Sequence, residues 1–450
     1  MLGPIDIFAG LFVFILLDRI LVWRLKRYDQ ASKRLIRMSF RFRIFLAIIY
    51  SLISAYYYKG GDTEMFLYGL KDMQEAVKSG SVSVLDVLLM NNSTDSDILS
   101  YYFAIDESIY PVDGFMKHAS NFMVPKIGLI PYLLTNSYIV LCFLYSFFAL
   151  AGAVRIYKLF VSYFPSMKAE IAIAVLFLPS VCYWSSGFLK DSLCFGALGF
   201  MLYAVYQIFI AKRKIIGSLI WLVISVYIIY TIKAYILLAL IPGIGFWLFG
   251  ALGGSIKNKV KRRVIIVISL GVAAVATVYF IGFLTSEESL AKFSMDNLLE
   301  SSENSREIFE RRSGEGSSFQ INTSNPVLMF INGLGATFFR PFPWEITSFI
   351  VLFSAMEALV FLTLILGLLF KIGVIKFLRT IFDSPLLILC FTFSIVFAVA
   401  VGISTTNFGS LSRYKIPCLP FYIMTIFAVY RIQKIAYPPW MQWILRRINV

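Results

Sequence analysis

The sequence predicts an all-α integral membrane protein with about eleven transmembrane helices. Hydrophobic residues make up 59% of the 450 positions and charged residues only 15%, a composition typical of a chain that crosses a membrane many times. Lysine and arginine gather in every second connection between the apolar segments, and the positive-inside rule assigns those connections to the cytoplasm. Membrane topology therefore explains the formal net charge of +15, and no nucleic-acid partner is predicted.

We expect the apolar segments to form one transmembrane domain over residues 1–450. Several are shorter than the ~20 residues that a straight span needs, so flanking aromatic and lysine side chains must reach the interface. The expected spans are 4–23, 44–58, 135–153, 169–184, 192–210, 215–231, 235–252, 264–284, 346–370, 384–402 and 416–430.

The connections differ in charge. Two long loops, 59–126 and 285–345, carry 10 and 9 acidic residues with 5 basic residues in each, and we expect both on the extracytoplasmic side. The amino terminus then lies outside and the carboxyl terminus in the cytoplasm. The expected cytoplasmic connections are 24–43, 154–168, 211–214, 253–263, 371–383 and the tail from 431.

Each long loop has a predicted character of its own. Residues 64–80 form an expected amphipathic helix along the membrane interface, whose apolar face consists of Met65, Phe66, Leu70, Met73 and Val77. The polar composition of 287–325 predicts a flexible segment that could order over a substrate.

Histidine and cysteine usage excludes several kinds of site. A single histidine, His118, argues against a Ser-His-Asp triad or an HExxH zinc site. The cysteines lie in or beside spans without CxxC spacing, so we expect small apolar packing residues and neither disulfides nor a metal site. They are Cys142, Cys182, Cys194, Cys390 and Cys418.

The first outward loop opens with two glycines and a carboxylate, Gly60-Gly61-Asp62, followed by Thr63 and Glu64. The glycines permit a sharp turn. Asp62 would then lie at the membrane surface, where it could act as a general base, with Glu64 as a substrate contact. The alternative is that Asp62 caps the helix that follows.

A second outward turn joins Trp184 to Lys190 and Asp191. Asp191 is expected to cap the next helix, whose dipole with Lys190 would bind an anion such as a lipid-linked phosphate or pyrophosphate. Trp184 is a candidate substrate contact. The alternative is an ordinary capped helix with a snorkelling lysine. Lys233 forms the whole of a very short outward turn, either as a second phosphate contact or as a surface anchor.

The last two outward motifs combine arginine with aromatic residues. Prolines are expected to hold the segment around Arg340, Trp344 and Glu345 extended above the membrane. Arg340 suits phosphate recognition and Trp344 a sugar ring, with an interfacial anchor as the alternative. Arg413 is a further candidate phosphate contact, beside Tyr414, and snorkelling is its alternative.

Glu357 falls near the middle of the ninth expected span. A carboxylate inside a membrane is a functional candidate, although it could instead pair with a polar group of a neighbouring helix.

Together, the outward motifs resemble bacterial cell-envelope glycosyltransferases of the GT-C superfamily. These have about eleven or more spans and a catalytic carboxylate in the first large outward loop, which Asp62 matches, although one more span precedes it here. Ser186-Gly187 with Lys190-Asp191, and Arg413-Tyr414 with Pro417, are similar to later elements of that family. The segment from Phe339 to Glu345 also resembles Wzy-like surface-polysaccharide polymerases.

The resemblance implies transfer of a sugar from a polyprenyl-phosphate-linked donor to a glycan or lipid acceptor, in a bacterial cytoplasmic membrane. Asp62 would deprotonate the acceptor hydroxyl, with inversion at the anomeric carbon. Lys190, Arg340 and Arg413, together with Lys233, would neutralise the leaving phosphate. No protein-bound cofactor is expected, and a need for a divalent metal stays open, as does the oligomeric state.

Two other interpretations remain. A polymerase or ligase would transfer a whole glycan block between lipid carriers, using arginines of two outward loops. A flippase or exporter would need several charged residues at mid-membrane positions and internal repeats, of which the sequence shows mainly Glu357.

Overall fold

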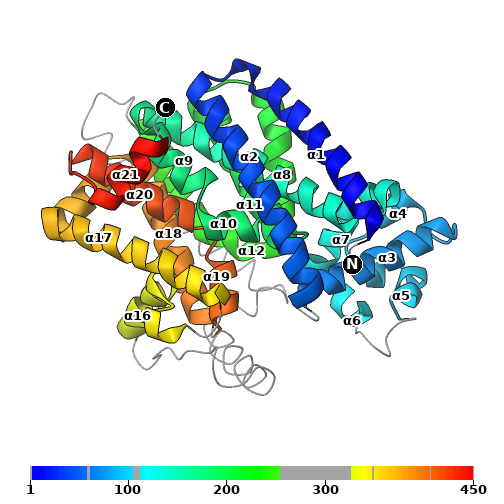
Figure 1. Ribbon diagram of the computed structural model, residues 1–450. Coiled ribbons are helices and arrows are strands. Elements are labelled where there is room, and N and C mark those ends of the chain that lie inside the picture. Colours follow the sequence, from blue (N-terminus) through cyan, green and yellow to red (C-terminus); the bar gives the residue numbers. More distant parts are fainter. Residues whose placement is uncertain are drawn as a thin grey trace. The chain divides into compact units, whose positions relative to one another are not determined.

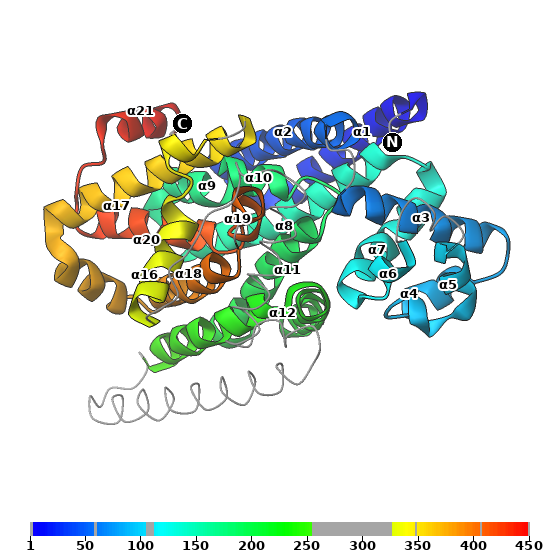
Figure 2. The same cartoon turned by 90° about the horizontal axis from the view of Figure 1, so that it is seen from below.

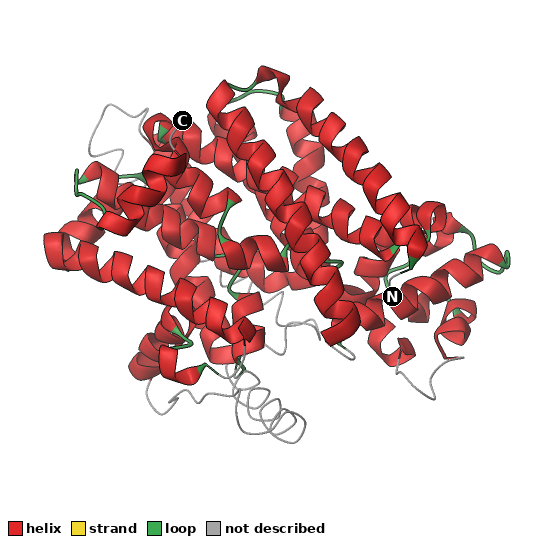
Figure 3. Ribbon diagram, in the orientation of Figure 1, coloured by secondary structure: helices red, strands yellow, loops and turns green. Residues whose placement is uncertain are grey.

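The computed structural model describes residues 3–57, 61–104, 112–253, 326–346, 349–405 and 407–448. Throughout these ranges the chain is helical, and Figure 3 shows helices and loops with no strand. The all-α prediction is therefore confirmed for the part of the chain that the structure describes. The expected span 264–284 and the expected flexible segment 287–325 lie outside these residues, as does nearly all of the connection 253–263.

Six of the described helices are long and apolar enough to cross a membrane, or seven if one bent helix pair counts as a single span. Eleven spans are therefore not confirmed. The segment 4–23 is a helix, but Asp6, Asp18 and Arg19 make it too polar to count. The segment 169–184 divides into two short helices, α9 (Lys168–Leu176) and α10 (Pro179–Trp184). The two segments 215–231 and 235–252 form two helices that meet at a non-helical kink at Lys233. They share the label α12 (Ile215–Gly253) and count as one candidate span.

The chain forms two compact units. Unit 1 consists of Met1–Lys158, Val181–Ala204 and Leu219–Lys233, and unit 2 of Leu159–Ser180, Val205–Ser218 and Ala234–Val450. The single transmembrane domain stays a prediction.

Unit 1 begins with a helical hairpin. Helices α1 (Pro4–Arg24) and α2 (Gln30–Leu52) run antiparallel (Figure 1), and the rings of Phe14 and Phe40 stack between them at 5.7 Å. The connection between them is short because a 3-10 turn, η1 (Leu25–Arg27), leads directly to Asp29, whose carboxylate caps α2 by accepting from the Ser32 N–H. The basic run 24–34 therefore lies at one end of this hairpin.

Two hydrogen bonds within unit 1 join segments that the charge pattern assigns to the same side of the membrane. At the basic end, Ser32 Oγ lies 3.1 Å from the Tyr157 hydroxyl, which joins the predicted cytoplasmic segments 24–43 and 154–168. At the other end, Ser137 Oγ donates to Asp6 over 2.6 Å, so that the start of α1 meets the beginning of the expected span 135–153. The alternation of the connections and the membrane side that each end faces stay predictions.

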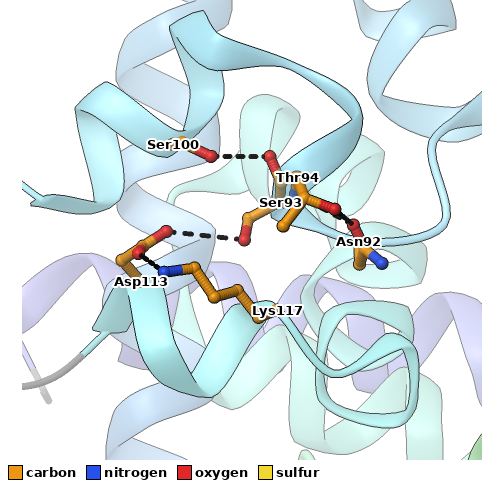
Figure 4. Close-up of polar contacts among 6 residues, drawn as sticks. All are labelled: Asn92, Ser93, Thr94, Ser100, Asp113 and Lys117. Carbon is orange, nitrogen blue, oxygen red and sulfur yellow. Dashed lines mark hydrogen bonds and ion pairs between the residues drawn. The ribbon is translucent and has the colours of Figure 1, made fainter.

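The first long loop folds into five helices, α3 (Asp62–Lys78), α4 (Val84–Leu89), α5 (Asp97–Ala104), α6 (Val112–Met116) and α7 (Ala119–Thr135). They gather into one group (Figure 2), and α3 packs on α5, α6 and α7. Figure 4 shows part of its polar interior, where Asp113 accepts from Ser93 Oγ and pairs with Lys117.

Helix α3 is the amphipathic helix that the sequence predicts. Phe66, Leu70 and Met73 are fully buried, whereas Met65 and Val77 are half-buried. Because its apolar face packs on α7 and α5, that face is covered by the loop's own helices.

Glycines allow a close helix crossing in unit 1. Helices α8 (Tyr138–Tyr163) and α11 (Lys190–Val205) meet where Gly152 faces Gly196 and Gly199. A Cβ at Gly199 would lie 2.1 Å from the carbonyl oxygen of Gly152. The crossing therefore depends on small residues, as is common between membrane helices.

Gly199→Ala is expected to lower the free energy of unfolding by about 1–3 kcal/mol, because the added methyl overpacks a backbone-to-backbone contact. Gly217→Ala is the matched control, since a Cβ at Gly217 meets nothing within 4 Å. Thermal unfolding of the purified variants in one detergent measures the difference. Equal unfolding midpoints for the two variants would contradict the packing.

Unit 2 is built around helix α20 (Leu419–Ile432), in which every residue from Leu419 to Tyr430 is buried. The helices that surround α20 include α9, α17 (Phe349–Phe382) and α18 (Pro385–Ser404). Helix α16 (Pro326–Phe339) lies against α18, with Gly333 facing Gly402. Helix α19 (Phe408–Tyr414) precedes α20 at a bend of 67°.

All five cysteines are free and buried, as expected of apolar packing residues. Cys142, Cys182 and Cys194 belong to unit 1, and Cys390 and Cys418 to unit 2.

Candidate functional site

The first outward motif occupies the start of α3. Gly61 takes the N-cap position with a φ of 115°, which favours glycine. Asp62 is then the first helical residue and is exposed. The alternative that this motif caps the helix is therefore met through Gly61, one residue earlier than Asp62. Its charge is still favourable there, since the helix dipole is positive at this end.

Tyr50 of α2 joins the first outward motif to the second. Its hydroxyl lies 2.6 Å from Thr63 Oγ1, one residue after Asp62. Its ring covers Gly187, where a Cβ would be 2.3 Å from a ring carbon. Gly187 belongs to the turn that carries Trp184 and Lys190. Two motifs more than 120 positions apart in sequence are therefore in contact with one side chain.

The other predicted residues of these motifs also have defined neighbours. Glu64 accepts a hydrogen bond from the Tyr68 hydroxyl at 3.0 Å. Trp184 packs edge-on against Tyr183, with ring centroids 5.1 Å apart. Lys190 begins α11 and donates to Ser120 Oγ at 3.0 Å, so the second turn is also tied to the start of α7.

Asp191 and Lys233 form a buried ion pair. Lys233 Nζ donates to Asp191 Oδ1 at 2.5 Å, and the side chains are 6% and 2% exposed. Asp191 was expected to cap α11, but the helix begins at Lys190, so the carboxylate points from the first turn toward Lys233. The non-helical backbone of Lys233, with φ −148° and ψ 67°, is the turn that the sequence predicted. Since the two charges neutralise each other, the pair positions α11 against α12 better than it would bind a phosphate.

The structure adds a cation that the sequence analysis misplaced. Arg43 was counted with the basic connection 24–43, yet it lies within α2 and is 0% exposed. Its Nη1 donates to Ser185 Oγ at 2.6 Å, and its guanidinium lies over the ring of Phe195. Nε and Nη2 have no hydrogen-bond partner within the described residues. Such buried, unused donors mark a place where an anionic ligand would be stabilised.

Unit 1 thus gathers Tyr50, the 185–191 turn and Arg43 along one face of α2. Arg43 and Tyr50 are seven residues apart, about 10 Å along a helix. Ser185 accepts a hydrogen bond from Arg43, and Gly187 contacts the Tyr50 ring. The turn therefore extends along α2 from Arg43 to Tyr50, which contacts the start of α3. Of the predicted site residues, this unit brings together Asp62, Glu64, Trp184, Lys190, Asp191 and Lys233.

The remaining predicted residues belong to unit 2. Arg340 Nε donates to both carboxylate oxygens of Glu345, at 3.0 and 3.1 Å, and its guanidinium lies over the ring of Phe408. Burial raises the pKa of Glu345, but hydrogen bonds from Arg340 and from the Phe342 N–H outweigh it, so that this pKa lies below its ordinary value of 4.5. Trp344 is 80% exposed and stacks on Phe342.

Phe342 is extended, with φ −78° and ψ 163°, but Pro343–Glu345 forms a 3-10 helix, so the expectation of an extended segment through Trp344 and Glu345 is wrong. Because Glu345 already neutralises Arg340, this arginine is less suited to a phosphate than the sequence suggested. Arg413 is half-buried in the last turn of α19, followed by Tyr414.

Glu357 pairs with neighbouring polar groups, which was one of its two predicted roles. Its carboxylate accepts from the Ser180 N–H at 3.1 Å and from Ser180 Oγ at 2.6 Å. It also interacts electrostatically with Lys415, which is 1% exposed and whose Nζ has no hydrogen-bond partner in the described part of unit 2. Lys415 was not singled out from the sequence, because it lies between the apolar start of α20 and the more conspicuous Arg413.

Among the described residues, no group of three or more His, Cys, Asp or Glu side chains is placed to hold a metal ion. Comparisons of the chain with protein-family models, curated proteins and solved structures found no match. Function must therefore be argued from the arrangement of these residues.

Proposed function

We propose that this membrane protein transfers a sugar from a polyprenyl-phosphate-linked donor to a hydroxyl of a glycan or lipid acceptor. The observation that carries the proposal is the convergence on Tyr50. Tyr50 contacts both Thr63, at the start of α3, and the turn that contains Gly187. Ser185 in that turn accepts a hydrogen bond from Arg43, whose other guanidinium nitrogens have no hydrogen-bond partner within the described residues. A base and a buried cation held by one scaffold suit a reaction in which an alcohol attacks and a phosphate leaves.

Asp62 is the base of this proposal. Its carboxylate accepts the proton of the acceptor hydroxyl as the oxygen forms a bond to the anomeric carbon. The bond from that carbon to the phosphate oxygen breaks, and the polyprenyl phosphate leaves with the electron pair. Attack from the face opposite the leaving group inverts the anomeric configuration. Asp62 is exposed at the start of α3, so an acceptor hydroxyl can reach its carboxylate.

Arg43 and Lys190 are the cations that stabilise the leaving phosphate. Arg43 has two guanidinium nitrogens without partners, and Ser185 fixes the third. Arginine donors match phosphate oxygens in pairs. The buried setting excludes water, which strengthens the interaction as negative charge accumulates on the phosphate.

The lipid carrier explains why such a site would be built within membrane helices. Arg43 belongs to a helix that is long and apolar enough to span the bilayer, so a phosphate could reach it while the polyprenyl chain stays among the lipids. The charge pattern predicts that the loop 59–126 and the turn after Trp184 are extracytoplasmic, so an outward-facing site in a bacterial cytoplasmic membrane is part of the proposal.

Asp62→Asn is expected to reduce sugar transfer by about 10²–10⁴-fold, because it removes the general base and retains the size of the side chain. Surface glycans and lipid-linked intermediates are compared in cells with equal amounts of each variant. A truncated glycan with accumulated lipid-linked donor is the expected result. Glu75→Gln is the matched control, since Glu75 is exposed on the same helix thirteen positions away.

The same assay separates the alternatives. Single repeat units in place of long chains would assign the chemistry to a polymerase, which moves a glycan block by the same bond changes. An unchanged glycan profile with Asp62→Asn would rule out Asp62 as the base, and a flippase would then become the leading candidate.

A further inference from the structure

A basic pocket lies in unit 1 between the end of α1 and the first half of α2, from Val22 to Arg41. Its volume is about 500 Å³, and its polar lining consists of Lys26, Gln30, Lys33, Arg34, Arg37 and Arg41. The lining contains five cationic side chains and no carboxylate. Of the two nearest acids, Asp18 pairs with Arg37 at 3.9 Å and Asp29 is engaged in capping α2. The pocket therefore keeps a large excess of positive charge.

The rest of the lining is apolar. Val22, Leu25 and Met38 complete the pocket, and Val22 and Met38 are 38% and 44% exposed. Further along the same two helices, Trp23 and Phe45 are 59% and 58% exposed. Positive charge beside an exposed apolar strip matches a ligand with an anionic head and a hydrocarbon chain.

One donor in this pocket is unused. Arg37 Nε is buried and has no hydrogen-bond partner within the described residues. Arginine commonly gives such donors to phosphate oxygens, and clusters of lysine and arginine beside membrane helices bind anionic lipids. An ordinary solvated basic face would need neither a pocket nor an apolar wall.

We infer that this pocket binds the phosphate headgroup of an anionic membrane lipid, whose acyl chains lie against Val22 and Met38. The site is separate from the residues around Tyr50, and it stands whether or not sugar transfer occurs there. A lipid bound at the hairpin would fix α1 against α2 at their basic ends.

Native mass spectrometry of the purified protein in detergent tests this site. Phosphatidylglycerol and phosphatidylcholine with the same acyl chains are titrated separately, and inorganic phosphate is added as a competitor. The test variant is Lys33→Gln/Arg34→Gln/Arg41→Gln, which leaves the Arg37–Asp18 pair intact. The control variant, Lys212→Gln/Arg213→Gln/Lys214→Gln, removes the same number of charges from another basic connection.

We expect the wild type and the control variant to bind phosphatidylglycerol at least about tenfold more tightly than the test variant does. Phosphatidylcholine should bind all three proteins weakly. Equal loss of phosphatidylglycerol binding in both variants would overturn the proposal, because the net charge of the protein would then explain the binding without a specific pocket. Displacement of the lipid by millimolar inorganic phosphate would also overturn it, in favour of a soluble phosphate ligand.

Discussion

Arg43→Met is expected to abolish sugar transfer while leaving the protein as stable as the wild type or more stable. The guanidinium is fully buried with two nitrogens unpaired, which costs folding free energy. Replacing buried ionic groups with apolar side chains of similar size is often neutral or stabilising by about 1–4 kcal/mol. If Arg43 neutralises the leaving phosphate, its loss should slow transfer by about 10²-fold or more.

Lys126 is the matched control for this prediction. It is also a buried cation of unit 1, at 6% exposed, but its Nζ donates to the Met90 carbonyl at 2.6 Å. Lys126→Met should therefore lower the free energy of unfolding by about 1–3 kcal/mol, because the carbonyl loses its charged donor. Thermal unfolding in detergent and the cellular glycan assay are measured for both variants. A stable and fully active Arg43→Met protein would show that Arg43 has no role in transfer. An unstable Arg43→Met protein would contradict the expected effect on stability.

The second large effect concerns the Asp191–Lys233 pair. Asp191→Asn is expected to lower the free energy of unfolding by about 3–5 kcal/mol, since it leaves Lys233 charged and buried without its partner. Lys233→Met should have a similar cost for the converse reason. The double variant should recover most of the loss, because two neutral groups need no partner. Denaturation in a single detergent, arranged as a double-mutant cycle, measures the coupling.

The Asp113–Lys117 pair provides the comparison. It has the same 2.5 Å separation, but the lysine side chain is 52% exposed, against 6% for Lys233. Neutralising Lys117 should cost less than about 1 kcal/mol, as is usual for solvated ion pairs. Equal costs for the two pairs would mean that burial of Asp191 and Lys233 is not what makes them important.

The sequence predicted the features of the fold that depend on local patterning. The amphipathic spacing of Phe66, Leu70 and Met73 predicted α3. The break at Lys233 followed from a lysine between two apolar segments. Span counting was less successful. Hydropathy does not reveal that Phe177 ends α9, and α1 is one continuous helix that carries Asp6, Asp18 and Arg19.

The candidate site depended on contacts that local patterns cannot reveal. Asp62 and the 185–191 turn were each recognised, but only Tyr50 shows that they meet. Arg43 was hidden within the basic run that precedes it. A signal was nevertheless present, since Arg43 shares the helical spacing of Ile36, Phe40, Ala47 and Tyr50, all of which are buried. An ionic partner, such as Glu345 for Arg340, likewise decides whether an arginine is available to bind a phosphate. A sequence motif alone does not show such a partner.

Photochemical labelling with a diazirine-bearing polyprenyl phosphate tests the central claim most directly. The purified protein is labelled, digested, and the modified peptides are identified by mass spectrometry. We predict labelling of the segments around Arg43 to Tyr50 and Ser185 to Lys190, lost in Arg43→Met and retained in the Lys33→Gln/Arg34→Gln/Arg41→Gln variant. Labelling confined to residues 22–41, or labelling that Arg43→Met does not change, would contradict a phosphate site at Arg43.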